Sequence, residues 1–197
     1  MAKKTINVGM VGAAFMGKAH SVGYRDVAFA FPDVELTPVM KEVAAITQSE
    51  ADAAAETLGW ERASEGFEGI VSRDDIQLID ICTGNNTHKD IAVAAAQAGK
   101  HVFCEKPLAN TLKDAEKMVE AVEKAGVKHM VGFNYRTVPA IALAKRLIDE
   151  GKIGTIYHWR AQYLQDWILD PEFPLVWRLQ KKICGSGALG DLAAHLI

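Results

Sequence analysis

The chain has 197 residues, of which 49% are hydrophobic and 24% are charged, and its formal net charge is −3. These values are those of an ordinary globular protein that can bury its own core without disulfides or metal ions. The slightly acidic balance provides no basic field for a nucleic acid, so we expect no nucleic-acid partner.

The three cysteines indicate the cellular compartment of the protein. Cys82, Cys104 and Cys184 are odd in number and widely spaced. They lack the short paired spacing of a zinc site and the density of a disulfide framework. We therefore expect reduced thiols, a cytoplasmic protein and no bound metal.

The N-terminal apolar run could pass for a signal peptide. Asn7 and three glycines interrupt it between residues 6 and 17, and Lys18 follows at once, so a first β-strand explains it better. No apolar run approaches the ~18 residues needed to cross a bilayer. We therefore expect no membrane partner.

The first two thirds of the chain alternate apolar runs with alanine-rich helical patterns. Strands are expected over residues 6–11, 35–45, 78–82, 101–104 and 129–133. Helices are expected over residues 16–29, 49–58, 88–98 and 111–125. Continuous apolar strands are typical of a parallel sheet covered on both faces, and their alternation with helices predicts an α/β fold built from βαβ units.

Residues with known capping preferences mark the predicted helix ends. Gly59, Gly99 and Gly126 stand where C-caps are expected, because glycine adopts the left-handed conformation without strain. Ser49 and Thr111 stand where N-caps are expected, because their hydroxyls can accept a hydrogen bond from the first turn.

The character of the sequence changes after about Tyr135. A helix, a half-exposed strand, a long structured loop and a final helix are expected over residues 139–150, 155–163, 164–187 and 189–197. We therefore expect a nucleotide-binding domain over residues 1–135 and the incomplete beginning of a second domain over residues 136–197.

A Gly-x-Ala-x-x-Gly sequence joins the first strand to the first helix. Gly12 permits a tight turn, Ala14 lets the backbone approach a ligand, and Gly17 allows the helix to pack closely on the strand. The amides of the helix N-terminus, near Phe15 and Met16, would then face a pyrophosphate. Glycines also occur in plain turns, but the flanking strand and helix favour a dinucleotide loop.

The end of the second strand leaves the choice of cofactor open. A dinucleotide site usually has Asp or Glu there for the ribose hydroxyls, whereas this chain has Ala45. Thr47 and Ser49 could bind a 2′-phosphate, which favours NADP, but no arginine accompanies them. We therefore expect NAD or NADP.

Several motifs together carry a family resemblance. They are residues 12–17, residues 83–88 (TGNNTH), residues 105–107 (EKP), residues 132–136 (GFNYR), and residues 185–191 (GSGALGD) with His195. In these motifs the chain resembles the Gfo/Idh/MocA oxidoreductases, the group of glucose–fructose oxidoreductase and inositol dehydrogenase. Residues 163–167 (YLQDW) and 177–178 (WR) look like the branch that contains levoglucosan and inositol dehydrogenases.

The resemblance implies an NAD(P)-dependent oxidoreductase that oxidises a secondary alcohol of a sugar or cyclic polyol. It also implies a Rossmann doubly wound parallel sheet, followed by the start of a second α/β domain for substrate binding and oligomerisation. The full-length protein would then be a homo-oligomer. By motif position the catalytic residues would be Lys106, Asp191 and His195. Further cofactor contacts would be Thr83, Asn85, His88, Glu105 and Lys106.

Alcohol oxidation explains why these residue types are needed. A base must take the hydroxyl proton, and His195 titrates near working pH. A helix would place Asp191 and His195 on one face, so that the aspartate orients the histidine or holds a substrate hydroxyl. The ammonium of Lys106 would stabilise the developing alkoxide. Each of these residues alone is more often structural; their combination and order favour function.

Aromatic and polar residues of the second segment are candidates for substrate binding. Tyr135 and Trp167 can stack on the apolar face of a sugar ring, while Gln165 and Arg178 can bind its hydroxyls. The remaining histidines are interpreted as structural, namely His20, His101, His129 and His158, and His88 as either a capping residue or an exposed one. Two alternatives stay open: a cofactor-binding regulator without turnover, and a glycoside hydrolase that uses NAD transiently.

Overall fold

The computed structural model describes residues 4–197. The chain divides into two compact units, Met1–Val131 and Gly132–Ile197, which are described separately. No helix in the described part is long and apolar enough to cross a membrane. The three cysteines are buried free thiols, as expected.

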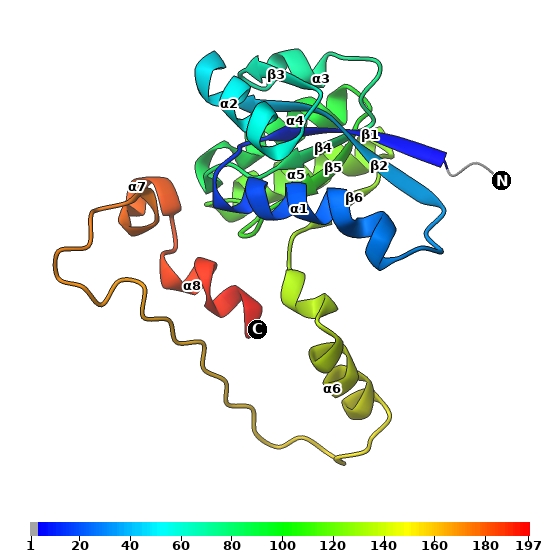
Figure 1. Ribbon diagram of the computed structural model, residues 1–197. Helices are drawn as coiled ribbons and strands as arrows, with labels where there is room; N and C mark the ends of the chain where they lie inside the picture. The colour runs from blue at the N-terminus through cyan, green and yellow to red at the C-terminus, as the bar shows by residue number, and fades with distance from the viewer. Residues whose placement is uncertain (1–3) are drawn as a thin grey trace. The chain divides into compact units, whose positions relative to one another are not determined.

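The first unit is built on a six-stranded parallel sheet in the order β3-β2-β1-β4-β5-β6 (Figure 1). After β3 the chain returns to the centre and lays β4 beside β1, which creates the switch point where such sheets bind ligands at their carboxyl ends. The Rossmann fold expected from the sequence is confirmed. The strands are β1 Lys4–Val11, β2 Leu36–Ala45, β3 Arg62–Glu65, β4 Leu78–Ile81, β5 His101–Cys104 and β6 His129–Val131.

Helices cover both faces of this sheet, because apolar side chains of the strands point alternately to one face and the other. Val8 and Met10 of β1 belong to one buried cluster with Trp60, whereas Val11 belongs to a second cluster with Ile91. Successive strand residues point to opposite faces, so a continuous apolar strand supplies both clusters. The helices are α1 Phe15–Ala30, α2 Gln48–Leu58, α3 Glu68–Val71, α4 His88–Gln97 and α5 Leu112–Ala125.

The helix caps follow the sequence with two corrections. The first is at the end of α4, where Ala98 is the C-cap and the predicted Gly99, with a φ of 73°, is the residue after it. Gly59 and Gly126 are left-handed C-caps, with φ of 83° and 65°, and Thr111 accepts a hydrogen bond from the third residue of α5. The prediction of Ser49 as an N-cap is wrong. Thr47 caps α2 instead, because Glu50 completes a capping box with it.

Three short elements of the first unit were not expected from the sequence: β3, α3 and the 3₁₀ helix η1 Asn85–Thr87. Strand β3 has the polar sequence RASE and pairs only with β2, at the edge of the sheet. A four-residue strand of this composition carries no hydrophobic period, and α3, also four residues long, is too short to show one.

The second unit consists of short helices joined by extended chain. Its elements are η2 Asn134–Thr137, α6 Pro139–Asp149, η3 Trp177–Leu179, α7 Lys181–Cys184, α8 Ala188–Asp191 and η4 Ala193–His195. The expected strand over residues 155–163 does not form, because residues 132–197, all described, contain no partner strand to satisfy its backbone. The expected helix over residues 189–197 is interrupted at Leu192, so Asp191 and His195 lie in separate elements.

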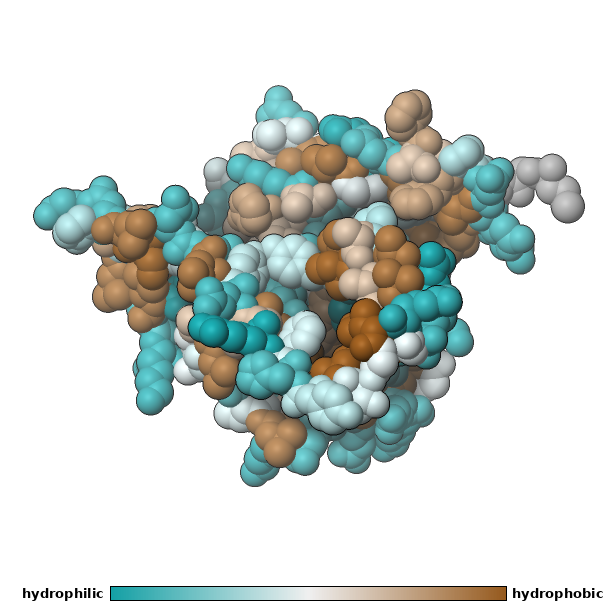
Figure 2. All heavy atoms as spheres, turned by 90° about the horizontal axis from the view of Figure 1, so that it is seen from below, coloured by the Kyte–Doolittle hydropathy of each residue, from teal (hydrophilic) through white to brown (hydrophobic). Residues whose placement is uncertain are grey.

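The second unit buries little of its apolar surface. Helix α6 has no buried residue, and Ile141, Leu143 and Leu147 are each more than a third exposed. Apolar side chains are visible among polar ones on the face drawn in Figure 2.

Candidate active site

The loop between β1 and α1 can be built only with glycine at two positions. Gly12 has a φ of +98°, and a Cβ there would lie 2.8 Å from the carbonyl carbon of Cys82. At Gly17, a Cβ would lie 2.2 Å from the carbonyl oxygen of Gly12. The backbone amide of Gly12 donates to the carbonyl oxygen of Ala44 at 2.9 Å, which ties the loop to the sheet.

The N-terminus of α1 suits an anion. Ala14 is its N-cap and supplies no side-chain hydrogen bond, and no acidic residue lies in the first turn. The positive end of the helix dipole therefore meets no side-chain anion there, which fits a dinucleotide pyrophosphate. The side chain of Phe15, the first residue of α1, is 75% exposed. The loop thus fits the cofactor that the sequence predicted.

The end of β2 carries more negative charge than the sequence suggested. After Ala45, the hydroxyl of Thr47 accepts from the amide of Glu50 at 3.3 Å, and the Glu50 carboxylate accepts from the amide of Thr47 at 3.3 Å. The Glu65 carboxylate, at the end of β3, accepts from the amide of Gln48 at 3.3 Å. Two carboxylates next to this strand end would repel a 2′-phosphate.

The loop after β4 is held together by short polar contacts and a buried histidine. Thr87 donates to the hydroxyl of Thr83 at 2.7 Å, and Asn85 is buried. His88, one of the expected cofactor contacts, is fully buried, so the alternative of an exposed His88 is wrong. Its ring nitrogens lie 3.1 Å and 3.2 Å from the carbonyl oxygens of Pro107 and Thr83, and the ring thus joins the loops after β4 and β5.

Glu105 and Lys106 follow β5 at the carboxyl edge of the sheet. The amide of Glu105 donates to the carbonyl of Ile81 at 2.9 Å, which continues the β4–β5 ladder. The side chain of Glu105 then turns back, and its Oε2 accepts from the backbone amide of Lys106 at 3.1 Å. Glu105 is buried and Lys106 is partly buried, with a cis peptide bond before Pro107.

A cluster of buried charged side chains lies next to Glu105 and was not expected from the sequence. The Nδ1 of His20 lies 2.8 Å from Oδ2 of Asp80, and its Nε2 lies 3.1 Å from Oε1 of Glu105. The hydroxyl of Tyr24 donates to Oδ2 of Asp80 at 2.8 Å. One signal for it was present: a carboxylate inside the apolar strand β4 requires a partner when it is buried.

The ionisable groups of this cluster are strongly perturbed. Burial disfavours the charged ring of His20, but hydrogen bonds to Asp80 and Glu105 outweigh it and raise the pKa of His20 to about 10. Burial, with the nearby Asp80 carboxylate, raises the pKa of Tyr24 and of the Cys82 thiol well above their usual values. His20 is therefore a cation at neutral pH, while the phenol and the thiol stay neutral.

The second unit brings together most of its predicted substrate residues. The hydroxyls of Tyr135 and Tyr163 hydrogen bond to each other, the side-chain amide of Gln165 donates to Tyr163 at 3.0 Å, and the indole of Trp167 donates to Gln165 at 3.0 Å. The ring of His195 lies 4.5 Å from that of Tyr135, between centroids. Tyr163 was missing from the predicted substrate residues, although it stands in the motif that contains Gln165 and Trp167.

Arg178 and Asp191 are the remaining predicted site residues of this unit. The guanidinium of Arg178 lies over the ring of Trp177, 4.4 Å from its centroid, in a cation–π contact. Asp191 ends α8, and the interruption at Leu192 removes the continuous helix on which its pairing with His195 was based.

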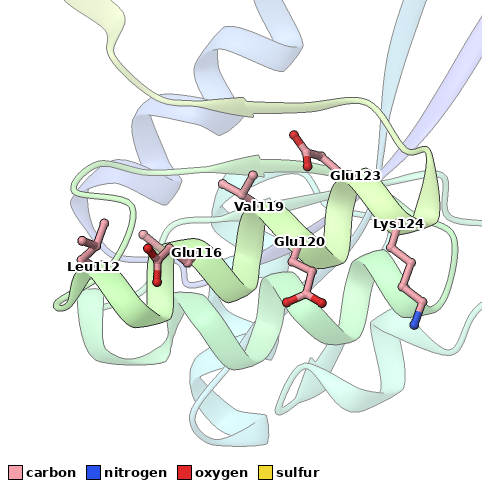
Figure 3. Close-up of a pocket in the computed structure, with 7 residues that line it drawn as sticks. Leu112, Glu116, Val119, Glu120, Glu123 and Lys124 are labelled. Carbon is pink, nitrogen blue, oxygen red and sulfur yellow. The ribbon is translucent and has the colours of Figure 1, made fainter.

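A separate hollow of about 550 Å³ runs along α5 (Figure 3). Leu112 and Val119 line it together with Glu116, Glu120 and Lys124, all from this one helix. Its lining mixes charges of both signs and holds none of the predicted site residues. We therefore do not assign it to the active site.

Two parts of the chain match known protein domains. Residues 6–133 match the family described as "Oxidoreductase family, NAD-binding Rossmann fold". Residues 141–197 match the family described as "GFO/IDH/MocA C-terminal domain". The first match covers more than half of the chain.

Sugar dehydrogenases are among the relatives in sequence. The chain is 48% identical over 194 residues to levoglucosan dehydrogenase of Pseudarthrobacter phenanthrenivorans, which is 98% of this chain and 50% of that protein. It is 30% identical over 191 residues to D-apiose dehydrogenase of Paraburkholderia graminis, which is 95% of this chain and 47% of that protein. The chain thus spans about half the length of the curated relatives it matches.

Solved structures of oxidoreductases are also similar to this chain. A levoglucosan dehydrogenase in complex with NADH and levoglucosan has a TM-score of 0.96 at 48% identity, covering 98% of this chain and 52% of that one. An oxidoreductase domain protein from Kribbella flavida has a TM-score of 0.94 at 51% identity, covering 98% of this chain and 51% of that one.

Proposed function

Since the chain belongs to the GFO/IDH/MocA oxidoreductase family, we propose that it forms the cofactor-binding part of a dehydrogenase that oxidises a secondary alcohol of a sugar or cyclic polyol. The observation that carries the proposal is the glycine loop, which leads into the uncapped N-terminus of α1 and lies in the same Rossmann unit as Glu105 and Lys106. A bound nicotinamide would supply the hydride acceptor.

We propose NAD rather than NADP as the cofactor. The carboxylates of Glu50 and Glu65 lie next to the end of β2, where a 2′-phosphate would need a cation. This choice replaces the preference for NADP drawn from Thr47 and Ser49. A relative of this chain is known in complex with NADH, which supports the proposal.

We assign the proton chemistry to His195, Lys106 and Asp191. His195 takes the hydroxyl proton of the substrate as general base, and the ammonium of Lys106 stabilises the developing alkoxide. Asp191 holds a substrate hydroxyl or orients His195. Thr83 and Asn85 contact the cofactor from the loop after β4. His88 holds that loop in place through its contact with the carbonyl oxygen of Thr83.

The hydrogen-bonded chain of Tyr135, Tyr163, Gln165 and Trp167 supports the proposed substrate class. Aromatic faces next to amide and phenol groups suit a sugar ring, whose two faces carry C–H groups and whose rim carries hydroxyls. Levoglucosan, the compound after which the relative at 48% identity is named, is the first candidate. Arg178 would extend this site at its margin.

The decisive experiment is a panel of sugars and polyols assayed with NAD and NADP in the full-length protein, by nicotinamide absorbance. We expect reduction of NAD with an anhydrosugar or a pyranose. Tight NADH binding without oxidation of any alcohol would contradict the proposal and favour a regulator. Release of an aglycone without net NADH would favour a glycoside hydrolase.

The catalytic role of Lys106 is tested by Lys106→Ala in the full-length protein. We expect kcat to fall by about 100-fold or more, because the alkoxide loses its nearest cation, with a smaller change in KM. Lys152→Ala, on an exposed turn, is the control and should leave kcat unchanged. Near-normal turnover of Lys106→Ala would refute the assignment.

We further propose that residues 1–135 bind the cofactor and that residues 136–197 begin the substrate domain. The exposed apolar residues of α6 would then be covered by the rest of the protein or by a second copy, in a homo-oligomer. Light scattering of the full-length protein tests the oligomer. The three reduced thiols favour a cytoplasmic location.

A further inference from the structure

The histidine at position 20 links three parts of the Rossmann unit that are far apart in the sequence. It lies on α1, the helix that begins at the glycine loop, and its ring stacks on Phe103 of β5 with centroids 5.1 Å apart. Its nitrogens contact Asp80 of β4 and Glu105 after β5, at 2.8 Å and 3.1 Å. The side chains of His20, Asp80 and Glu105 are only 13%, 0% and 6% exposed.

The geometry favours His20 protonated on both nitrogens. Each ring nitrogen faces a carboxylate, and a carboxylate only accepts hydrogen bonds, whereas a neutral imidazole has a single N–H to donate. The cation also offsets the repulsion between two buried negative charges. The other ionisable groups that face this cluster are Tyr24 from α1, Cys82 from the end of β4, and Cys104 from β5.

The second oxygen of Glu105 extends this network to the catalytic lysine. While Oε1 accepts from His20, Oε2 accepts from the backbone amide of Lys106 at 3.1 Å. The carboxylate of Glu105 is therefore held at one end by His20 and holds Lys106 at the other. Since a displacement of about 1 Å in a reacting group can cost ~100-fold in rate, the position of this backbone matters.

We propose that His20 is a positioning residue, which as a cation fixes the carboxylate of Glu105 and, through Glu105, the backbone from which Lys106 presents its ammonium. The proposal deepens the role proposed for Lys106 and rests on it. It also connects the helix of the phosphate loop to the catalytic lysine, because His20 belongs to α1.

A metal ion is the alternative occupant of this cluster. His20, Asp80 and Cys82 offer ligand atoms that lie within 4.8 Å of one another. The direct hydrogen bonds between His20 and both carboxylates already satisfy these groups, and the pKa of the Cys82 thiol is raised, which opposes thiolate ligation. Stoichiometric zinc in the purified full-length protein would overturn the proposal.

The first experiment measures the protonation of His20 directly, by ¹⁵N–¹H NMR of the histidine rings in the full-length protein. We expect both ring N–H groups of His20 to persist from pH 6 to pH 9. In Glu105→Gln the amide can donate to a neutral ring, so His20 should lose a proton at lower pH than in the wild type. A single N–H in the wild type at pH 7 would overturn the proposal, and this result does not depend on enzyme activity.

The second experiment is a kinetic cycle with His20→Gln, Lys106→Ala and the double variant. We expect His20→Gln to lower kcat by ~10- to 100-fold with sugar KM within about threefold, at temperatures well below its melting point. The double variant should be no slower than Lys106→Ala, because His20 acts through Lys106. The proposal would be overturned if the kcat losses of the two single variants multiplied in the double variant. It would also be overturned if His20→Gln lowered only the melting temperature and left kcat unchanged.

Two further variants serve as a control and as a substitute in this test. His129→Gln makes the same change on the exposed strand β6 and should leave kcat unchanged. Should His20→Gln not fold, Glu105→Gln serves instead. The kcat of Glu105→Gln, divided by the kcat of the wild type, should rise with pH as His20 becomes neutral in the variant. A ratio that does not change with pH would overturn the proposal. A Lys106→Ala variant with normal turnover would refute the role of Lys106, while the NMR result would still decide the state of His20.

Discussion

Gly12 and Gly17 are required at the residue scale for different reasons. Gly12 combines a φ of +98° with contact to the backbone of Cys82, so any side chain there is both strained and crowded. Gly17 has ordinary helical geometry, but its Cα faces the carbonyl oxygen of Gly12. The close approach of α1 to the loop therefore depends on the missing Cβ, as the sequence predicted.

The first residue-scale prediction concerns Gly17→Ala. A Cβ 2.2 Å from the Gly12 carbonyl must push α1 away from the loop, so NADH binding should weaken by about tenfold or more. Gly23→Ala is the matched control in the same helix, because a Cβ there meets no atom within 4 Å. Its unfolding free energy should rise by ~0.5–1 kcal/mol, with unchanged NADH affinity by fluorescence titration. Equal NADH affinities in the two variants would contradict this account.

The second residue-scale prediction concerns pH and His20. Its folded-state pKa of about 10 lies above the usual 6.5, so the folded protein binds the extra proton between these values. The stabilisation is complete below about pH 6.5 and is lost as the pH rises toward 10, at up to about 1.4 kcal/mol per pH unit. Urea unfolding at pH 7, 8 and 9 should show a steeper decline for the wild type than for His20→Gln. Parallel curves would speak against a buried cation.

At the element scale, neighbouring chain decides whether a local pattern becomes regular structure. Residues 155–163 alternate like a strand, but no strand in the second unit pairs with them, and they have no regular secondary structure. Residues 62–65 are polar and short, yet they form β3 because the edge of β2 is available to them. Strand formation needs a partner for its hydrogen bonds, and a sequence pattern does not reveal whether one is present.

The element-scale prediction concerns the cap of α2. Thr47→Ala removes the hydroxyl that accepts from the amide of Glu50, so the unfolding free energy should fall by ~1 kcal/mol. Ser49→Ala, two residues further into the helix, should be neutral or slightly stabilising because alanine is the better helix former. Chemical denaturation of both variants measures the difference, and a larger loss for Ser49→Ala would refute the observed cap.

At the scale of the whole molecule, burial is divided unequally between the two units. The first unit contains both buried clusters around its sheet. Among residues 132–197, which are all described, Cys184 is the one hydrophobic residue that is buried. The relatives are about twice as long as this chain.

This asymmetry predicts different behaviour for the two units in isolation. A polypeptide of residues 1–133 should unfold cooperatively and bind NADH, because its core and its glycine loop are complete. A polypeptide of residues 132–197 should show no cooperative transition, because it buries too little apolar surface to offset the entropy of ordering. Circular dichroism melting of each polypeptide tests this, and a sharp transition in the second one would contradict it.

The sequence by itself determined the parallel sheet, the dinucleotide loop, the caps at Thr111 and Gly59, and the position of Lys106 after β5. These features depend on neighbouring residues, so periodicity, glycine placement and a short motif were sufficient to predict them. Only the tertiary structure decided that His20 joins Asp80 to Glu105, and that Tyr163 joins Tyr135 to Gln165. These groups are separated by up to 85 positions, and packing of the helices and extended segments brings them together. A single histidine in an amphipathic helix carries no local mark of the two carboxylates it will meet.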